Sequence, residues 1–291
     1  MAIPGRVAII GLGIMGSAIA RNLLKSGFRV AGFDIDAARA RTLDGVVASA
    51  SSLDVVRESD IVLTSLPSDG ALESVIGEVI TANVVGKVCV ELSTLSMPAK
   101  DRARQRLESA GAIMLDCPIS GTGAQAVTGD LVVFVSGDQN AATKCAPVFA
   151  GFAKSSPYVG EFGNGMKLKL IANLLVAIHN VSTAEAVALG RRAGLDLDLL
   201  IKVIGPGAGG SRMLDVRGPL MAKGTYEPAT MKLDVWQKDM DLIAAFVDVL
   251  GANTPLFDAT RPLYAEANRR GWGARDTAAV HDVLDHESEA P

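Results

Sequence analysis

A glycine pattern near the start of the chain limits the possible folds sharply. Gly11-Leu-Gly-Ile-Met-Gly16 follows directly on a short apolar run, Arg6–Ile10. A segment with helical spacing of apolar residues continues from it to Ser26, and Gly27 stands where such a helix would end. A glycine turn between a buried strand and a helix is the arrangement that binds the pyrophosphate of a dinucleotide. The sequence therefore predicts a dinucleotide-binding unit here, with a glycine-rich turn that binds nothing as the alternative.

Each position of this turn has an expected task. Gly11 permits a tight turn, Gly13 lets backbone N–H groups approach the pyrophosphate, and Gly16 allows the helix to pack close to the strand. The N-terminus of the helix adds a partial positive charge that attracts phosphate. The residues expected to bind the cofactor in this turn are Gly11, Leu12, Gly13, Ile14, Met15 and Gly16.

An acidic residue follows at the distance that such a unit requires. The apolar run 28–33 predicts a second strand, and Asp34 comes directly after it, 18 residues beyond Gly16. A carboxylate about 20 residues on accepts hydrogen bonds from the adenosine ribose hydroxyls and repels a 2′-phosphate. No arginine stands at position 35, so we expect NAD rather than NADP as the cofactor. The alternative for Asp34 is a turn or helix-capping carboxylate, a role that suits Asp36 better.

The first half of the chain alternates strand and helix patterns. Beyond the glycine turn, strands are expected at 28–33, 60–66, 88–92 and 113–116, with helices at 72–80 and 100–110. Further strands at 131–135 and 158–159, with a helix at 140–149 between them, extend this unit. Such alternation is typical of a parallel sheet with helices on both faces. We therefore expect an α/β fold with an N-terminal, Rossmann-type, doubly wound and mostly parallel sheet of six strands.

After Gly165 the pattern changes to helices alone. A long segment, 168–190, has helical periodicity. Its expected apolar face consists of Leu170, Ile171, Leu174, Leu175, Ile178 and Val181. Further helices are expected at 195–204, 233–250 and 255–270, with a glycine-rich loop at 205–210. We expect residues 1–162 to form the NAD-binding domain and residues 163–291 an all-α C-terminal domain for substrate binding and dimerisation, beginning with the long interdomain helix.

Length and composition exclude several classes of protein. At about 150 residues per domain, a chain of 291 residues suggests two domains. The net charge of -4 argues against nucleic acid or an anionic membrane as a partner, since both require a positive field. No run of 18 apolar residues exists, so no membrane-spanning helix is expected. Three scattered cysteines and three histidines without ligand spacing predict neither disulfides nor a metal site, and we expect a soluble cytoplasmic protein.

Three residues of the long helix share one face. Gly165, Lys169 and Asn173 are each four positions apart, which brings a lysine and an amide together at the domain junction, where ligand sites are common. The ordinary pKa of a lysine, about 10.4, is too high for a general base at neutral pH. Burial and the positive charge of a nicotinamide ring would lower the pKa of Lys169 toward the ~7–8 that suits proton transfer. Periodicity alone favours an ordinary solvated lysine, which is what we expect of Lys167.

Four motifs stand in order over nearly the whole chain. They are the glycine turn with Asn22-Leu-Leu-Lys-Ser-Gly27 after it, Asp116-Cys-Pro-Ile-Ser-Gly121, Gly163-x-Gly165-x-x-x-Lys169, and Lys238-Asp-Met240. Together they resemble the motifs of the β-hydroxyacid dehydrogenase family, which contains 3-hydroxyisobutyrate dehydrogenase and tartronate semialdehyde reductase. The second motif is similar to the family's substrate-binding segment, the third to its catalytic-lysine helix, and the fourth to its Lys-Asp-Leu segment near the cofactor.

The resemblance implies an NAD-dependent oxidoreductase, EC 1.1.1.-, that transfers a hydride between nicotinamide and the carbinol carbon of a small β-hydroxy acid. It implies that Lys169 is the general acid/base. Ser120, Gly121 and Thr122 would hold the substrate carboxylate through hydroxyl and backbone N–H donors. Asn173 would bond either the reacting hydroxyl or the carboxylate.

The resemblance also implies further cofactor contacts and an assembly. Leu66 and Pro67 would flank the path from adenosine to nicotinamide, Thr94 would approach the nicotinamide ribose, and Lys238 would close over the cofactor. The helical domain would form a homodimer or a homotetramer.

Two departures from the family pattern lie where substrate is expected. Thr122 replaces the family's second glycine after Ser-Gly, and Ala172 replaces the first residue of its Asn-Asn pair. The added hydroxyl and the lost amide suggest a substrate other than 3-hydroxyisobutyrate, such as a hydroxylated sugar acid. Two other functions stay open: an imine reductase on the same scaffold, although such relatives usually lack the lysine, and a non-catalytic NAD-binding module.

Overall fold

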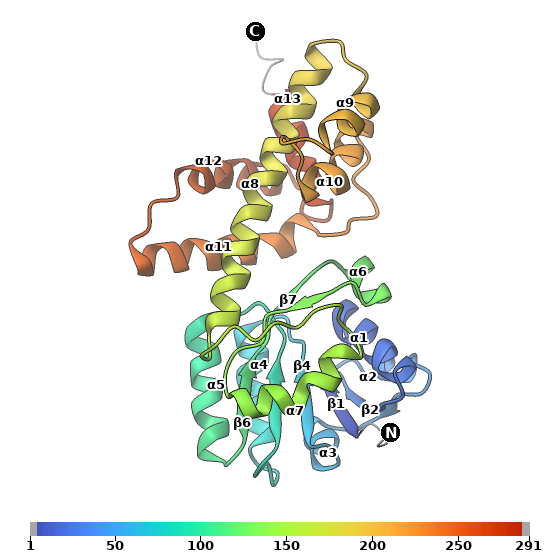
Figure 1. The fold of residues 1–291 in the computed structure, drawn as a ribbon, viewed down its shortest axis with the longest axis vertical. Helices are drawn as coiled ribbons and strands as arrows, with labels where there is room; N and C mark the ends of the chain where they lie inside the picture. Colours follow the sequence, from blue (N-terminus) through green and yellow to red (C-terminus); the bar gives the residue numbers. More distant parts are fainter. Residues whose placement is uncertain (1–4, 287–291) are drawn as a thin grey trace. The chain divides into compact units, whose positions relative to one another are not determined.

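The structure, a computed structural model, describes residues 5–286 of the chain (Figure 1). These residues form two compact units, of which the first ends at Lys169 and the second begins at Leu170. One helix, α8 (Asn164–Arg192), starts in the first unit and continues into the second.

The first unit is built on a six-stranded sheet with the order β3-β2-β1-β4-β5-β6. Every neighbouring pair of strands is parallel, as the alternation of strand and helix patterns predicts. The strands are β1 (Arg6–Ile10), β2 (Arg29–Phe33), β3 (Val47–Ala48), β4 (Ile61–Thr64), β5 (Val88–Glu91) and β6 (Ile113–Asp116). Only β3 has no counterpart among the expected strands, because two residues carry no pattern of their own. The Rossmann-type fold class is confirmed.

The central strand of this sheet is buried on both faces. In β1, Val7 and Ile9 pack into one hydrophobic cluster, while Ala8 and Ile10 pack into a second one. Successive side chains of a strand point to opposite faces, so two cores require an apolar residue at every position. This is the physical reason for the continuous apolar run that precedes the glycine turn.

Helices cover both faces of the sheet, and polar side chains fix where most of them begin. They are α1 (Ile14–Lys25), α2 (Ala37–Arg41), α3 (Ser52–Arg57), α4 (Asp69–Val79), α5 (Met97–Ser109), α6 (Gly123–Thr128) and α7 (Gln139–Ala150). Ser68 and Ser96 cap α4 and α5 by accepting a hydrogen bond from the first turn. Both helices therefore begin three residues before the apolar pattern that predicts them. The short helices α2, α3 and α6 have no counterpart among the expected elements.

A small antiparallel pair follows the sheet. It consists of β7 (Ile119–Ser120) and β8 (Val132–Val133). The strand expected at 131–135 is therefore present but shorter. The strand expected at 158–159 forms only an isolated bridge, between Val135 and Tyr158.

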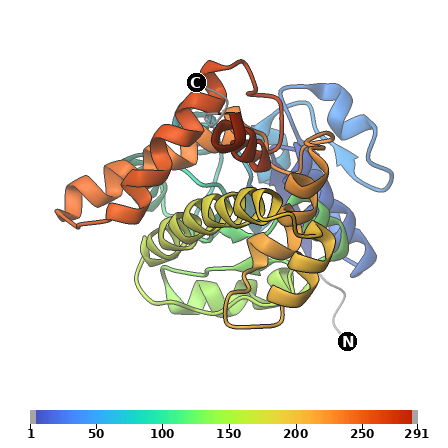
Figure 2. The same ribbon diagram turned by 90° about the horizontal axis from the view of Figure 1, so that it is seen from above.

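The second unit is helical, as expected. Beyond α8 it contains α9 (Leu197–Ile204), α10 (Arg212–Lys223), α11 (Leu233–Leu250), α12 (Pro255–Arg269), a 3-10 turn η1 (Thr277–Ala279) and α13 (Val280–His286). Figures 1 and 2 show α11 and α12 running side by side, joined by a short turn. From residue 170 to residue 286 no strand occurs, and the only ladder contact is a bridge between Lys232 and Asp276. The helices α10 and α13 have no counterpart among the expected elements.

The expected apolar face of α8 is partly wrong. Leu170 and Val181 are buried, but Ile171 and Leu175 are about half exposed, at 50% and 46%. The buried face instead includes Ala177 and the fully buried Asn180. The buried face could not be predicted from large apolar side chains alone, because a small alanine and a hydrogen-bonded asparagine also pack closely against other helices.

Asn180 shows why a polar residue can lie in that face. Its Nδ2 atom donates to the hydroxyl of Tyr264 and to the carbonyl oxygen of Thr277, both at 2.9 Å. These two bonds satisfy both N–H donors of the amide, while its buried Oδ1 atom has no hydrogen-bond partner among the described residues. By length and composition α8 could cross a membrane, but 44% of its most apolar window is buried here and core helices share that composition.

The three cysteines are buried and unpaired, as their scattered positions predict. Burial raises the pKa of the Cys89 and Cys145 thiols to about 12. Neither is a candidate nucleophile, since the reactive form of cysteine is the thiolate.

Candidate functional site

The expected cofactor residues of the first unit gather at one edge of the sheet. The glycine turn follows β1, Asp34 follows β2, Leu66 and Pro67 follow β4, and Thr94 follows β5. Since all six strands are parallel, these segments leave the sheet at its carboxyl edge. In this strand order β1 lies between β2 and β4, where the connections turn in opposite directions, and nucleotides bind at such a switch point.

Backbone packing at the turn explains two of its glycines. Gly11 has a φ of +92°, and a Cβ atom there would lie 2.1 Å from the carbonyl oxygen of Ser65. A Cβ atom on Gly16 would lie 1.9 Å from the carbonyl oxygen of Gly11. Any larger residue at either position would force the start of α1 away from β1 and β4.

Packing within the protein does not explain why position 13 is a glycine. The nearest atom to a Cβ at this position is Nη1 of Arg39, at 3.8 Å, so nothing in the protein excludes a side chain. Gly13 also precedes α1 without a side-chain cap on the helix start. Open space beside uncapped N–H groups fits a pyrophosphate, which would accept their hydrogen bonds.

Asp34 is held in place by the turn itself. Its Oδ2 atom accepts a hydrogen bond from the N–H of Leu12 at 2.7 Å, and its Oδ1 atom accepts one from Asp36 at 2.9 Å. The side chain is nearly buried. Asp36 caps α2 by accepting from Ala38, as its position predicts. The carboxylate of Asp34 is therefore fixed where β2 ends, within reach of the glycine turn.

Arg39 is a charged neighbour that sequence reasoning missed. Its Nη1 atom lies 3.4 Å from Oδ2 of Asp34, and its Nε atom lies 3.4 Å from Oδ2 of Asp36. The expectation from the sequence rested on position 35 alone, whereas the arginine that contacts Asp34 stands in the first turn of α2. A guanidinium beside this carboxylate would attract a 2′-phosphate, which the carboxylate would repel.

The loops after β4 and β5 are tied to each other beside the turn. The N–H of Leu66 donates to Oγ of Ser93 at 2.7 Å, and the N–H of Ser93 donates to Oε1 of Glu91 at 2.9 Å. A Cβ on Gly11 would meet the Leu66 side chain at 3.3 Å. Leu66 is half-buried and Pro67 is exposed. Leu66 therefore lies against the glycine turn, while Pro67 and Thr94 are placed only by their positions in the loops after β4 and β5.

The helix α6, which directly follows the expected carboxylate-binding segment, packs against the glycine turn and α1. A Cβ on Gly123 would be 2.7 Å from Cγ2 of Ile14, and Nδ2 of Asn22 in α1 donates to the carbonyl oxygen of Ala126 at 2.7 Å. Ser120 and Gly121 are only partly buried, and Gly121 has a φ of +143°. The first unit thus brings this segment beside the expected cofactor site.

Thr122 uses its donors locally. Its hydroxyl and its N–H both donate to Oε1 of Gln125, at 3.3 and 3.0 Å, and its Oγ1 accepts from the N–H of Gln125. This is a capping box at the start of α6. A role for Thr122 in holding the substrate carboxylate stays a prediction, and it would require this cap to open.

The start of α8 packs directly on the end of β6. A Cβ on Gly165 would lie 2.5 Å from the carbonyl oxygen of Phe134 and 2.8 Å from that of Asp116. Lys169 is one turn further along the same face and is half-buried, whereas Lys167 is exposed and bonds Asn164. The glycine of the third motif is therefore required by the contact that fixes the lysine's helix.

A buried set of charges lies beneath this contact. Nζ of Lys100 is 2.6 Å from Oε2 of Glu91 and 2.7 Å from Oδ1 of Asp116, and all three side chains are at most 1% exposed. Burial works against the ammonium, yet the charges of Asp116 and Glu91 raise the pKa of Lys100 above its ordinary value. Burial also raises the pKa of Glu91. Sequence reasoning missed Lys100 and Glu91, because neither belongs to a recognised motif.

In the second unit the structure joins Asn173 to the fourth motif. Nδ2 of Asn173 donates to Oδ2 of Asp239 at 2.9 Å, and Nζ of Lys238 lies 3.0 Å from Oδ1 of the same carboxylate. A carboxylate only accepts hydrogen bonds, so it holds the amide with its NH2 group toward Asp239. The Oδ1 atom of Asn173, on the other side of the amide, can only accept hydrogen bonds. Asp239 is a further residue that sequence reasoning missed, although it stands inside the quoted motif.

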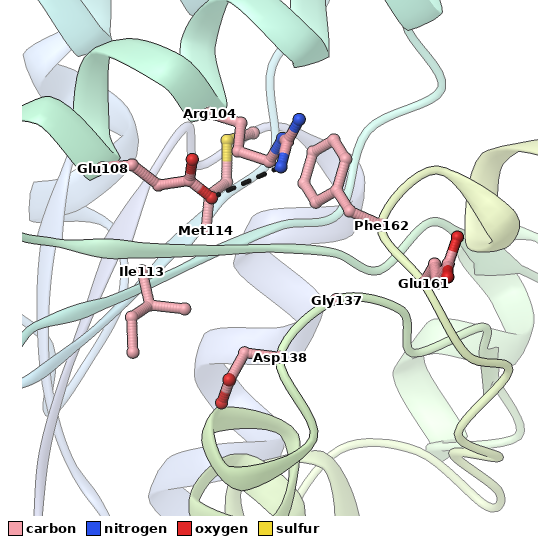
Figure 3. Close-up of a pocket in the computed structure, with 8 residues that line it drawn as sticks. All are labelled: Arg104, Glu108, Ile113, Met114, Gly137, Asp138, Glu161 and Phe162. Atoms are coloured by element: carbon pink, nitrogen blue, oxygen red, sulfur yellow. Dashed lines mark hydrogen bonds and ion pairs between the residues drawn. The ribbon is translucent and has the colours of Figure 1, made fainter.

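A separate pocket lies on the outer side of β6 (Figure 3). Arg104 and Glu108 of α5 enter it, and the Arg104 guanidinium lies over the ring of Phe162, 5.0 Å from its centroid. It is lined by Arg104, Glu108, Ile113, Met114, Gly137, Asp138, Glu161 and Phe162. None of these is an expected site residue, so this pocket is not the dinucleotide site.

Known proteins match both units in the same order. A family model for the NAD binding domain of 6-phosphogluconate dehydrogenase matches residues 6–160, and one for the NAD-binding of NADP-dependent 3-hydroxyisobutyrate dehydrogenase matches residues 163–284. The chain belongs to the β-hydroxyacid dehydrogenase family. It is therefore an NAD(P)-dependent β-hydroxyacid dehydrogenase, EC 1.1.1.-, that acts on small hydroxy acids.

Similar proteins of the family differ in their substrates. The chain is 31% identical to glyoxylate/succinic semialdehyde reductase 2, chloroplastic, of Arabidopsis thaliana, over 96% of this chain and 79% of that protein. It is 32% identical to L-threonate dehydrogenase of Cupriavidus necator, over 96% and 95%. The solved structure of Mycobacterium tuberculosis 3-hydroxyisobutyrate dehydrogenase with L-serine is 27% identical and has a TM-score of 0.88, over 97% and 99%.

The packing of the turn leads to a prediction for Gly16→Ala. The new Cβ would displace the start of α1 from Gly11, so we expect NADH affinity to fall by about tenfold or more. Titration of NADH fluorescence with the folded variant measures this. Gly70→Ala in α4 is the matched control, since a Cβ there meets nothing within 4 Å. Unchanged NADH affinity in Gly16→Ala would contradict the role of this turn.

Proposed function

We propose that the protein is an NAD-dependent dehydrogenase of a small β-hydroxy acid, 3-hydroxyisobutyrate-like or a hydroxylated sugar acid, with Lys169 as general acid/base. The observation that carries this proposal is the contact between Gly165 and the end of β6. It fixes the helix of Lys169 beside the segment that leads from Asp116 to Ser120, in the unit that holds the glycine turn.

The residues of this site suit proton transfer and anion binding. The nicotinamide, when bound, supplies the hydride acceptor or donor. Lys169 in its neutral form takes the hydroxyl proton of the substrate at Nζ, and in the reverse direction its ammonium returns the proton. Ser120 and Gly121 offer a hydroxyl and a backbone N–H to the substrate carboxylate. The Oδ1 atom of Asn173, which only accepts, suits the reacting hydroxyl or the Lys169 ammonium better than a carboxylate.

Removal of the lysine amine tests this proposal. We expect Lys169→Ala to lower kcat by about 10²–10⁴-fold, the usual contribution of general acid/base catalysis, with the dissociation constant for NADH within about twofold. Turnover is measured with NAD+ and a panel of 3-hydroxyisobutyrate, glycerate, threonate, 4-hydroxybutyrate and serine.

Lys167→Ala is the matched control, because this neighbouring lysine is exposed and bonds only Asn164 among the contacts described. A loss below about tenfold in Lys169→Ala would contradict the acid/base role. A cyclic imine joins the panel, and preferential imine reduction would point to the alternative enzyme class.

We further propose that NAD is preferred over NADP. The carboxylate of Asp34 is held by two backbone N–H groups at the place where the adenosine ribose is expected. Arg39 opposes this preference, but its guanidinium is shared between Asp34 and Asp36. We therefore expect the repulsion of a 2′-phosphate by Asp34 to outweigh its attraction by Arg39.

The preference is measured as kcat/KM with each cofactor. We expect NAD+ to exceed NADP+ by about tenfold or more, since a carboxylate repels the 2′-phosphate. Asp34→Asn is expected to reduce this ratio, whereas Arg39→Ala is expected to raise it. Equal efficiencies with the two cofactors in the unaltered protein would contradict the proposal.

We also propose that the chain forms a homodimer or homotetramer through its helical unit. The helix α9 has a strongly apolar side but no buried residue in the single chain. Leu199 and Val203 on this helix are 58% and 66% exposed. Apolar residues gathered in this way are typical of surfaces that a partner covers.

Light scattering coupled to size-exclusion chromatography tests the assembly. We expect a mass of two or four chains, and a shift toward one chain when Leu199 and Val203 are both changed to Asp, because two charges in an apolar interface oppose burial. Val85→Asp, at an exposed valine of the first unit, is the control. A single-chain mass for the unaltered protein at micromolar concentration would contradict this proposal.

A further inference from the structure

Two carboxylates and one ammonium lie buried together where β5 and β6 end. Glu91 is the last residue of β5, Asp116 is the last residue of β6, and Lys100 reaches both from α5. Taking three charges out of water costs more than their mutual attraction commonly returns, and apolar residues of similar size often serve stability as well. Such a set therefore calls for a role beyond stability.

The structure connects this set to the first turn of α8. The Oδ2 atom of Asp116 accepts a hydrogen bond from the N–H of Met166 at 2.8 Å. Oγ of Ser136 accepts one from the N–H of Gly165 at 3.0 Å, and the same hydroxyl lies 2.9 Å from the carbonyl oxygen of Asp116. Two amide groups at the start of a 29-residue helix are thus bonded by residues far away in sequence.

The charge of Asp116 suits this position. A carboxylate at a helix N-terminus is favoured by the helix dipole, and its other oxygen is fixed by Lys100. Asp116 therefore cannot rotate without breaking either the contact to Lys100 or the one to Met166. The hydrogen bond from Met166 and the close backbone contact of Gly165 therefore both oppose a shift or a rotation of the start of α8.

Asp116 also begins the segment expected to bind substrate. Ser120 follows it by four residues, and Lys169 follows Met166 by three. We propose that Asp116, clamped by Lys100 and Glu91, is a positioning residue that sets the Lys169 amine relative to the Ser120 segment. This inference rests on the acid/base role proposed for Lys169. It assigns a function to three buried residues that do not touch the expected cofactor turn.

If Asp116 positions Lys169, a change at Asp116 should lower turnover by displacing the Lys169 amine. Displacing a catalytic group by about 1 Å can cost about 10²-fold, so we expect Asp116→Asn to lower kcat by about tenfold or more. The dissociation constant for NADH is expected to stay within about twofold, because the glycine turn keeps its own contacts. Turnover and NADH fluorescence titration are measured on the full-length protein at a temperature where the variant is folded by circular dichroism.

A double-mutant cycle separates positioning from a general structural role. If Asp116 acts through Lys169, then Asp116→Asn will change the residual rate of Lys169→Ala by less than about twofold, because residues that act as a unit are not additive. A merely structural role would lower the rate by the same factor in both backgrounds. Equal factors would overturn the proposal.

Ser136→Ala keeps the test valid if Asp116→Asn does not fold. This variant removes one oxygen and leaves the three charges in place, so we expect a folded protein with kcat lowered several-fold and NADH affinity unchanged. The matched control is Asp138→Ala, which removes the cap of α7 in the same unit without touching α8. We expect the control to keep the kcat of the unaltered protein.

The outcomes distinguish this inference from the proposed function. Full turnover in Lys169→Ala would overturn the acid/base role, and with it the premise of the inference. A large loss in Lys169→Ala together with unaltered kcat in Asp116→Asn and Ser136→Ala would overturn the positioning role alone.

Discussion

The contact of backbone on backbone at the carboxyl edge of the sheet is the constraint on which the rest of this structure depends. Gly11 and Gly16 bring the start of α1 against β1 and the loop after β4, and Gly165 brings the start of α8 against the end of β6. In each case a Cβ atom would lie closer to a carbonyl oxygen than real Cβ atoms do. The two helices that carry the expected cofactor turn and the expected catalytic lysine are thus fixed to one sheet by the absence of side chains.

Buried carboxylates then orient the functional side chains and the helix start on this fixed backbone. The turn holds Asp34 through the Leu12 N–H, and Asp116 holds the first turn of α8. In the helical unit Asp239 orients the Asn173 amide and pairs with Lys238. These carboxylates act as acceptors for donors at defined positions, and each is at most 8% exposed. A buried carboxylate keeps its geometry because losing a partner leaves a charge without compensation.

Much of the fold and part of the site could be read from residue patterns. Five of the six sheet strands and most of the long helices follow from residue patterns, because a strand buried on both faces is a continuous apolar run and a helix with one buried face has a period of 3.6. The short elements β3, α2, α3 and α6 could not be found in this way, since they are set by local caps and turns. Arg39, Lys100 and Glu91 lie outside every motif, and their partners are distant or on another element. The exposed positions of Ile171 and Leu175 show the same limit, because periodicity cannot tell which side of an apolar helix its own unit covers.

Sequence by itself determined the parallel sheet, the helical second half, the glycine turn and the family, because these depend on spacing along one chain. Only the tertiary structure decided which donors are already engaged, as in the capping box of Thr122, and which carboxylates hold the helix of Lys169. The physical reason is that hydrogen bonds and ion pairs between distant residues depend on directions and distances in space. A linear pattern specifies that a residue is buried or exposed, but the folded backbone determines which atom it meets.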